Sequence, residues 1–409
     1  MVFVRQPCCG GCRDFLVVAP GFLGQHAGMI SSVVELLQQL IRIPSVNPDD
    51  QSGFAGGGEA AIADFLRTWL EDQGAEVFVE EVLPGRPNVI ARFAPMDGRP
   101  RVLLGPHLDT VGVANMTIDP FAAELRDGKV WGRGASDTKG PMAAMLWALR
   151  EHASSLATLP VAVDFVAFMG EESGQWGSKH FAEHHGRFYD FAIAGEPTSL
   201  DVVYTTKGSL WATLEAQGKA AHSSMPEKGS NAIMTLARAL DRLEEDLRPL
   251  LASYSHPVLG ASTMNVGTFH GGTRANIVPD HAEAQLDIRI APSLDEAGGA
   301  LALLESVIAR LSLPVRLCYA HENPPMETSC ENPYLRLLQQ SRQGTRLVGA
   351  PWFSDAAHLS RGGIPSVCIG PGSIDQAHTA DEFLRLEDLL EGVNHFSRFV
   401  ESLKRHPGN

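Results

Sequence analysis

A chain of 409 residues, 44% hydrophobic and 20% charged, has the composition of a globular protein, and its length favours two domains over one. Acidic residues outnumber basic residues, 48 against 33, and the resulting net charge of −15 disfavours binding to nucleic acids or to anionic membrane surfaces. No run approaches the roughly 20 apolar residues that a membrane-spanning helix requires. We therefore expect neither a nucleic-acid nor a membrane partner, and we expect a cytoplasmic location.

The six cysteines are too few and too scattered to form a disulfide framework. Three of them, Cys8, Cys9 and Cys12, lie close together, but the other three form no second pair that would complete a metal site. Arginines interrupt the apolar runs of residues 1–28, so this segment is not expected to be a signal peptide. We expect the folded chain to begin at about residue 29, with the preceding residues a disordered tail or an extension of the reading frame.

Helical and strand patterns alternate from residue 29 onward. Apolar residues recur at helical spacing in residues 31–41 and 59–73, and a third helix is expected over residues 141–152, with proline in its first turn. Short apolar runs predict buried strands over residues 101–105, 161–169, 191–194 and 366–369. Strands that alternate with helices predict an α/β fold, with a mainly parallel mixed sheet flanked by helices on both faces.

The order of the elements changes between about residues 205 and 321. Here the pattern is strand, helix, two strands, helix and strand, over residues 208–217, 231–247, 262–269, 282–290, 294–311 and 314–320. This β-α-β-β-α-β order is typical of small two-layer, ferredoxin-like domains. We therefore predict a discontinuous main domain, residues 29–204 and 322–409, into which residues 205–321 are inserted as a second domain.

The four strands predicted in the main domain end near residues that bind metals or transfer protons. Together with an aspartate in the segment Gly-Ala-Ser-Asp, these residues are His107, Asp109, Asp137, Glu171, Glu172, Glu196 and His378. Ligands of open α/β sheets bind beyond the carboxyl ends of the strands. We therefore expect the segments that carry these residues to converge on one site.

Two imidazoles and three carboxylates can hold two divalent ions if one carboxylate bridges them. Metals about 3.5–4 Å apart can share a water and lower its pKa towards neutrality. A carboxylate outside the ligand set must then take the proton and pass it to the departing amine. Glu171 and Glu172 can supply one of each, because neighbouring side chains in an extended segment point opposite ways. Asp109 lies on the same side as His107 and can accept the second imidazole N–H.

These motifs together resemble those of the di-zinc aminoacylase and carboxypeptidase family, which includes acetylornithine deacetylase, succinyl-diaminopimelate desuccinylase and glutamate carboxypeptidase. The resemblance extends from about residue 41 to residue 383. It is carried by His107-Leu-Asp109, Gly-Arg-Gly-Ala-Ser-Asp137-Thr-Lys-Gly, Glu171-Glu172, Gly-Glu196-Pro and His378. Within the family, residues 207–224 and 370–378 are most similar to acetylornithine deacetylase.

The resemblance implies a site for two divalent metal ions, expected to be zinc, with cobalt or manganese able to substitute. Asp137 would bridge the two ions. His107 and Glu196 would complete one coordination sphere, and Glu172 and His378 would complete the other. The peptide between Asp137 and Thr138 would be cis.

The same resemblance implies roles for residues that do not bind the metals. Glu171 would be the general base. His222 would reach the site of a neighbouring subunit and stabilise the oxyanion, so the enzyme would be a homodimer assembled through the inserted domain, which would also act as a lid. Arg289 and Asn276 would hold the substrate carboxylate, and Gly372 would contribute to substrate binding.

We predict a metal-dependent amidohydrolase that removes an acyl group, expected to be acetyl, from a small amino acid, as acetylornithine deacetylase does in arginine biosynthesis. One departure bears on the substrate, because Ser354-Asp355-Ala356 resembles the desuccinylase and carboxypeptidase branches more closely. A carboxypeptidase would share every catalytic residue and differ only in its pocket. A non-catalytic binding protein of this fold should have lost ligands or the base, yet all six positions are filled.

Overall fold

The structure, a computed structural model, describes residues 30–50 and 56–405 of the chain. The predictions for residues 1–28, including those for Cys8, Cys9 and Cys12, lie outside the described residues. The architecture below is that of the compact unit Ser32–Asn409. Among the helices of the described residues, none combines the length and the apolarity that crossing a membrane requires.

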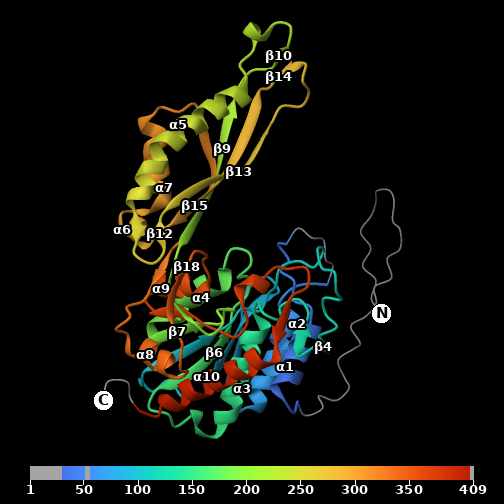
Figure 1. Cartoon of the computed structure of the whole chain (residues 1–409), viewed down its shortest axis with the longest axis vertical. Coiled ribbons are helices and arrows are strands. Elements are labelled where there is room, and N and C mark those ends of the chain that lie inside the picture. The colour runs from blue at the N-terminus through green and yellow to red at the C-terminus, as the bar shows by residue number, and fades with distance from the viewer. Residues whose placement is uncertain (1–29, 51–55, 406–409) are drawn as a thin grey trace, which may run out of the picture. The chain divides into compact units, whose positions relative to one another are not determined.

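A nine-stranded mixed sheet organises the part of the chain that carries the predicted site (Figure 1). Its order is β1-β2-β6-β3-β7-β19-β8-β17, and β18 pairs with β8. The strands are β1 (Glu76–Leu83), β2 (Arg86–Arg92), β3 (Arg101–Gly105), β6 (Ala162–Ala167), β7 (Phe191–Ala194), β8 (Val202–Thr206), β17 (Met326–Glu327), β18 (Leu347–Ala350) and β19 (Ser366–Cys368).

The four strands predicted for the main domain, β6, β3, β7 and β19, are neighbours at the centre of this sheet and pair in parallel. Every residue of these strands is buried, which explains their continuous apolar sequences. Towards both edges the pairing changes, because β1 with β2, β2 with β6, β19 with β8 and β8 with β17 are antiparallel. The sheet is therefore mixed, and parallel mainly at its centre.

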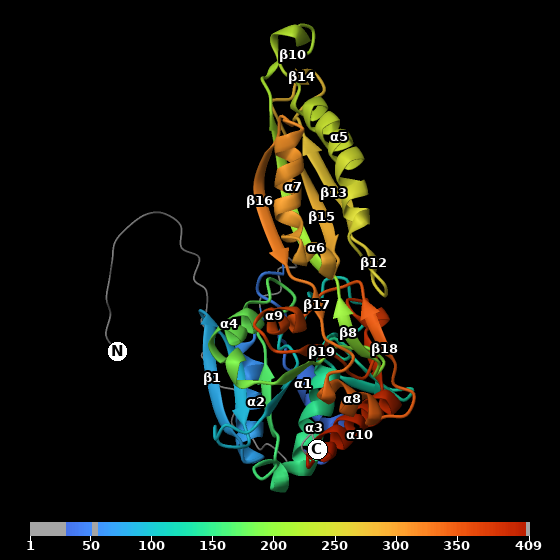
Figure 2. The same ribbon diagram turned by 90° about the vertical axis from the view of Figure 1, so that its left-hand side faces the viewer.

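Helices flank this sheet, as the sequence predicted. On one face, Leu103, Val166 and Ala192 pack with Phe181 of α4 and Leu359 of α9. The helix α3 packs against α1 and α10, and this second group lies on the other side of the strands (Figure 2). The helices are α1 (Val33–Arg42), α2 (Ala60–Asp72), α3 (Lys139–Leu156), α4 (Trp176–His185), α8 (Pro333–Gln340), α9 (Asp355–Arg361) and α10 (Leu386–Ser402).

Residues 208–323 form a separate antiparallel sheet of order β13-β15-β9-β16, with two long helices on one of its faces (Figure 1). Alternate residues of the strands, such as Leu214 and Leu286, are buried against Leu236 and Leu243 of α5 and Leu304 of α7. In chain order the elements are β9 (Gly208–Gln217), α5 (Ala232–Ser253), β13 (Thr263–Gly271), β15 (His281–Ile290), α7 (Gly299–Arg310) and β16 (Arg316–Asn323).

Short elements complete the fold. A small three-stranded sheet of order β20-β5-β4 places the chain near residue 382 beside the chain near residue 131, because Phe383 pairs with Trp131. The short elements are β4 (Glu124–Arg126), β5 (Lys129–Trp131), β10 (Ala221–His222), β11 (Ser255–His256), β12 (Gly260–Ala261), β14 (Ile277–Val278), α6 (Pro292–Glu296) and β20 (Phe383–Arg385).

The buried histidine His395 on α10 makes the stability of the fold sensitive to acid. Its Nε2 lies 3.0 Å from the carbonyl oxygen of Leu338, and burial lowers its pKa from 6.5 to about 4. Between these two values the unfolded chain binds a proton at this residue and the folded chain does not. The free energy of unfolding should therefore fall by up to about 3 kcal/mol as the pH falls from 6.5 to 4.

Urea unfolding at about pH 7 and about pH 4.5 measures this dependence. We expect His395→Gln to lose less stability on acidification than the wild type does. His184→Gln, at an exposed position of α4, is the matched control and should keep the wild-type dependence. An unchanged pH dependence in His395→Gln would show that this residue does not titrate as described.

Candidate active site

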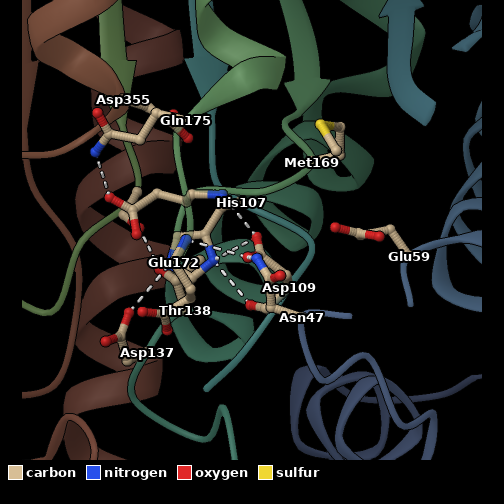
Figure 3. A network of polar contacts seen from close by, with 12 residues as sticks. Asn47, Glu59, His107, Asp109, Asp137, Thr138, Met169, Glu172, Gln175 and Asp355 are labelled. Atoms are coloured by element: carbon tan, nitrogen blue, oxygen red, sulfur yellow. Dashed lines mark hydrogen bonds and ion pairs between the residues drawn. The ribbon is translucent and has the colours of Figure 1, made fainter. Parts of the chain in front are cut away.

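Four of the predicted site residues, His107, Asp109, Asp137 and Glu172, lie close together in the main domain (Figure 3). His107 follows β3, Glu172 follows β6, and Asp137 immediately precedes α3. One side-chain atom from each of these three residues can be chosen so that all three lie within 4.8 Å of one another, a spacing suited to a metal ion. The Asp137–Thr138 peptide is cis, as predicted.

His107 is buried and held between two acceptors. Its Nδ1 lies 2.9 Å from the main-chain oxygen of Asp109, which leaves Nε2 facing Oδ1 of Asp137 at 3.1 Å. Burial disfavours the charged ring, but the carboxylate of Asp137 outweighs it and raises the pKa of His107 well above its ordinary value. If Nδ1 donates to the carbonyl, an unprotonated Nε2 and a carboxylate oxygen face each other, and a metal ion between them would bind both.

His378 faces the other oxygen of the same carboxylate. Its Nε2 lies 3.4 Å from Oδ2 of Asp137 and 3.2 Å from Oε2 of Glu172. Hydrogen bonds to Asp137 and then to Glu172 raise the pKa of His378 to about 10. Asp137 thus presents one oxygen to each histidine, which is the arrangement that a bridging carboxylate needs.

Further carboxylates surround this pair of histidines. Burial raises the pKa of Glu172 to about 7 and raises the pKa of Glu171 and of Glu196 well above the ordinary value. The charges of these residues also act on one another and on His107. Within the described part of the chain, Oε1 of Glu172 has no hydrogen-bond partner. A cluster of buried carboxylates with an unpartnered oxygen fits the binding of divalent cations.

Asp109 holds the loop that carries both glutamates. Its carboxylate accepts hydrogen bonds from the main-chain N–H groups of Glu171, at 3.0 Å, and Glu172, at 3.1 Å, and from Nδ2 of Asn47 at 2.6 Å. Its Oδ1 is 3.6 Å from Nδ1 of His107, so the histidine is oriented by the main-chain oxygen of Asp109 and not by the carboxylate that we expected. The carboxylate oxygens are occupied by donors from the neighbouring loop.

Two buried residues beside the glutamates were not predicted as parts of the site. Gln175, whose φ of +53° is left-handed, donates a hydrogen bond of 2.9 Å from Nε2 to Oε1 of Glu171. Asp355 is 1% exposed, and burial raises its pKa to about 7. In the sequence, Asp355 stands out only as part of the motif Ser354-Asp355-Ala356, which differs between branches of the family. Asn47 carried no signal, because it lies 62 residues before its partner Asp109.

The remaining predicted residues lie on other elements. His222 and Asn276 come together at the paired strands β10 and β14, where the N–H of Ser223 donates to the Asn276 carbonyl at 3.1 Å. Arg289 on β15 donates to Oδ2 of Asp287 at 2.9 Å. Gly372, with a φ of +88°, accepts from the N–H of Ser199. Among the described residues, the hydrogen bonds and ion pairs of these four predicted residues do not reach His107, Asp137 or His378.

Comparisons with known proteins identify the family of this chain. The sequence model of peptidase family M20/M25/M40 matches residues 103–402. The acetylornithine deacetylase of Vibrio campbellii is 31% identical over 377 residues, 90% of this chain and 98% of the relative. The acetylornithine deacetylase of Pectobacterium atrosepticum is 33% identical over 364 residues, 86% of this chain and 92% of the relative.

Solved structures share the fold at lower identity. The M20 family metallo-carboxypeptidase of Sulfolobus solfataricus superimposes with a TM-score of 0.75 at 21% identity, covering 91% of this chain and 99% of the other. A tripeptidase of Staphylococcus aureus gives 0.74 at 22% identity, covering 93% and 100%. A dinuclear metal-binding M20 peptidase of Bacillus subtilis gives 0.62 at 16% identity, covering 90% and 96%.

The family match covers most of the chain, and the two sequence relatives align with 90% and 86% of it. The chain therefore belongs to peptidase family M20/M25/M40 and is a hydrolase that acts on amide bonds.

Proposed function

We propose that this hydrolase uses two divalent metal ions to remove an acyl group from an N-acyl amino acid, with N-acetylornithine as the first candidate substrate. The observation that carries the proposal is the carboxylate of Asp137, which faces His107 with one oxygen and His378 with the other. The curated relatives named acetylornithine deacetylase support the choice of substrate.

The donor set of this site suits two ions. His107 and Glu196 would hold one ion and Glu172 and His378 the other, with Asp137 shared between them. Zinc is the expected metal, because imidazole and carboxylate ligands suit it, and cobalt or manganese could substitute. When bound, the ions would lower the pKa of a water molecule and polarise the scissile carbonyl group.

Glu171 is placed to move the proton. It precedes Glu172 in the loop held by Asp109, and its Oε1 accepts a hydrogen bond from Gln175. We assign it as the general base, which takes a proton from the attacking water and delivers it to the leaving amine. The bond from Gln175 fixes the orientation of the carboxylate, so that its other oxygen is left for the reacting proton.

Substrate recognition belongs to residues outside the metal cluster. The planar guanidinium of Arg289, which lies over the ring of Phe353 at 5.8 Å, can bind a substrate carboxylate through two parallel hydrogen bonds. Asn276 and Gly372 are our further candidates for substrate contacts. Ser354-Asp355-Ala356 favours the second candidate activity, a succinyl-diaminopimelate desuccinylase or glutamate-type carboxypeptidase, which would use the same metal and base residues.

Residues 205–321 are proposed to form a ferredoxin-like lid and dimerisation domain. The strand β13 lies at an edge of its sheet and exposes Val266 and Phe269, so it offers both backbone groups and apolar side chains to a second copy. In the homodimer, His222 would serve the partner's site. The main domain of residues 29–204 and 322–409, the cytoplasmic location and the absence of nucleic-acid partners stay predictions.

The metal requirement and the substrate can be tested together. We expect a chelator to abolish activity and added zinc or cobalt to restore it, because the clustered carboxylates need cations to act on the substrate. Hydrolysis rates should be measured with N-acetylornithine, N-acetylcitrulline, N-succinyl-diaminopimelate and a dipeptide with C-terminal glutamate. Full activity of the thoroughly demetallated protein would refute the proposed mechanism, and a preference for the third or fourth compound would select the second candidate activity.

The two adjacent glutamates should separate into distinct roles. We expect Glu171→Gln to retain the metals but to lose at least roughly 10²–10⁴-fold in kcat, because the amide cannot accept the proton. The matched variant Glu172→Gln should instead lose bound metal. Metal content by elemental analysis, together with kcat on the best substrate, distinguishes the two outcomes. Equal metal loss in both variants would contradict the assignment.

Subunit complementation tests the role of His222. The variants His222→Ala and Glu171→Gln should each be nearly inactive, since removing one oxyanion donor costs roughly 10²–10³-fold in kcat in other enzymes. Mixing them under conditions that exchange subunits should restore activity, because one site of the heterodimer then contains both intact residues. If exchange is verified by mass and activity stays at the background, His222 does not act in the partner subunit's site.

A further inference from the structure

Glu382 is a fully buried carboxylate that the proposed mechanism does not use. It accepts four hydrogen bonds, all from the segment that leads into the bridging aspartate. Oε2 accepts from Nη1 of Arg133 at 2.8 Å and from the N–H of Gly134 at 2.9 Å, and Oε1 accepts from the N–H of Ser136 at 2.8 Å and of Asp137 at 3.0 Å. Its side chain is 0% exposed.

The fold brings Glu382 to this position through the small sheet of β4, β5 and β20. Phe383, the first residue of β20, pairs with Trp131, the last residue of β5. The main-chain oxygen of Glu382 accepts from the N–H of Gly132 at 3.0 Å, and the hydroxyl of Ser136 donates to the Phe383 carbonyl at 2.9 Å. The two segments are thus joined along several residues, and the carboxylate lies at the end of this junction nearest Asp137.

Neutralising Arg133 does not account for this arrangement. Arg133 is 2% exposed and requires a negative partner, but that partner needs only one contact with its guanidinium. Three of the four donors are main-chain N–H groups of Gly134, Ser136 and Asp137. The carboxylate therefore fixes the path of the backbone that presents Asp137.

Glu382 also lies four residues after His378 in the sequence. It connects the segment that carries one predicted metal ligand to the loop that carries the bridging ligand. The Nε2 of His378 and Oδ2 of Asp137 are 3.4 Å apart, so a small displacement of one segment would change the geometry between them.

We infer that Glu382 is a positioning residue for the metal pair, because it fixes the position of Asp137 relative to His378. This inference rests on the proposed two-metal function. The loss of Glu382 should act unequally on the two ions. The ion that Asp137, Glu172 and His378 would hold would have two ligands whose relative position depends on Glu382. The ion that His107, Asp137 and Glu196 would hold would have one such ligand.

The test is a zinc titration of the metal-free protein by isothermal titration calorimetry, for the wild type and for Glu382→Gln. The amide keeps the size of the side chain but presents an NH₂ group to backbone and arginine donors. We expect the wild type to bind two ions per chain and Glu382→Gln to bind one of them about 10–100-fold more weakly, as is typical when a residue that orients metal ligands is changed.

Asp164→Asn is the matched control. Asp164 is also fully buried and accepts from Nη1 of Arg101 at 2.6 Å and from the hydroxyl of Tyr189 at 3.0 Å. Neither of these partners is adjacent in the sequence to a predicted metal ligand. It should reproduce the stability cost of losing a buried carboxylate–arginine pair while both zinc affinities stay at the wild-type values. Unfolding temperatures of the metal-free proteins establish that the two stability costs are comparable.

Two results would overturn the inference. One is a folded Glu382→Gln with two wild-type zinc affinities, and the other is an equal loss of affinity in Asp164→Asn. Should Glu382→Gln fail to fold, Glu382→Asp carries the same test, because it keeps the charge opposite Arg133 but shortens the reach to the backbone donors. A wild type that binds fewer than two ions would refute the proposed function instead, and the wild-type titration reveals this outcome separately.

Discussion

Buried negative charge is the constraint on which this structure depends. Asp137, Glu196 and Asp355 are each at most 7% exposed, and the side chain of Glu172 is 8% exposed. Carboxylates removed from water repel one another and favour their neutral forms, and for Glu172 burial raises the pKa to about 7. Cations placed among them favour the charged forms. The two histidines supply part of that compensation, and divalent ions would supply the rest.

A second set of carboxylates meets the constraint in another way. Asp109 accepts N–H groups from the loop of Glu171 and Glu172, and Glu382 accepts N–H groups from the loop of Asp137. Main-chain N–H groups satisfy the oxygens of these buried carboxylates as hydrogen-bond acceptors without adding charge of their own. These two residues therefore tolerate burial and fix the loops that carry the predicted ligands. The strands bring the loops to one edge of the sheet, and the second set of carboxylates determines their conformation.

The difference between carboxylates that are predicted ligands and carboxylates that hold loops explains which site residues could be predicted from the sequence. His107, Glu172 and Glu196 could be proposed as ligands from the sequence because they follow β3, β6 and β7, whose apolar runs are fully buried. The strand β1 was not predicted, since its sequence EVFVEEVL contains three glutamates in eight residues and none of its residues is buried. Glu382 was missed because its role consists of bonds to backbone groups about 245 residues earlier in the chain. No local pattern encodes such a contact.

The residues proposed to carry the chemistry also differ in their contacts from the residues proposed to determine the substrate. Of the residues assigned to the metals and the proton, Glu171 and Glu172 lie in a loop held by Asp109, and Asp137 lies in a loop held by Glu382. Arg289 is different, because its hydrogen bond goes to Asp287 on its own strand. A residue whose hydrogen bonds stay within its own strand can be substituted without moving the predicted metal ligands. The similar proteins are named acetylornithine deacetylases, a carboxypeptidase and a tripeptidase, so the family alone does not determine the substrate. The substrate must be found by experiment, because the residues proposed to recognise it lie outside the loops that carry the predicted metal ligands.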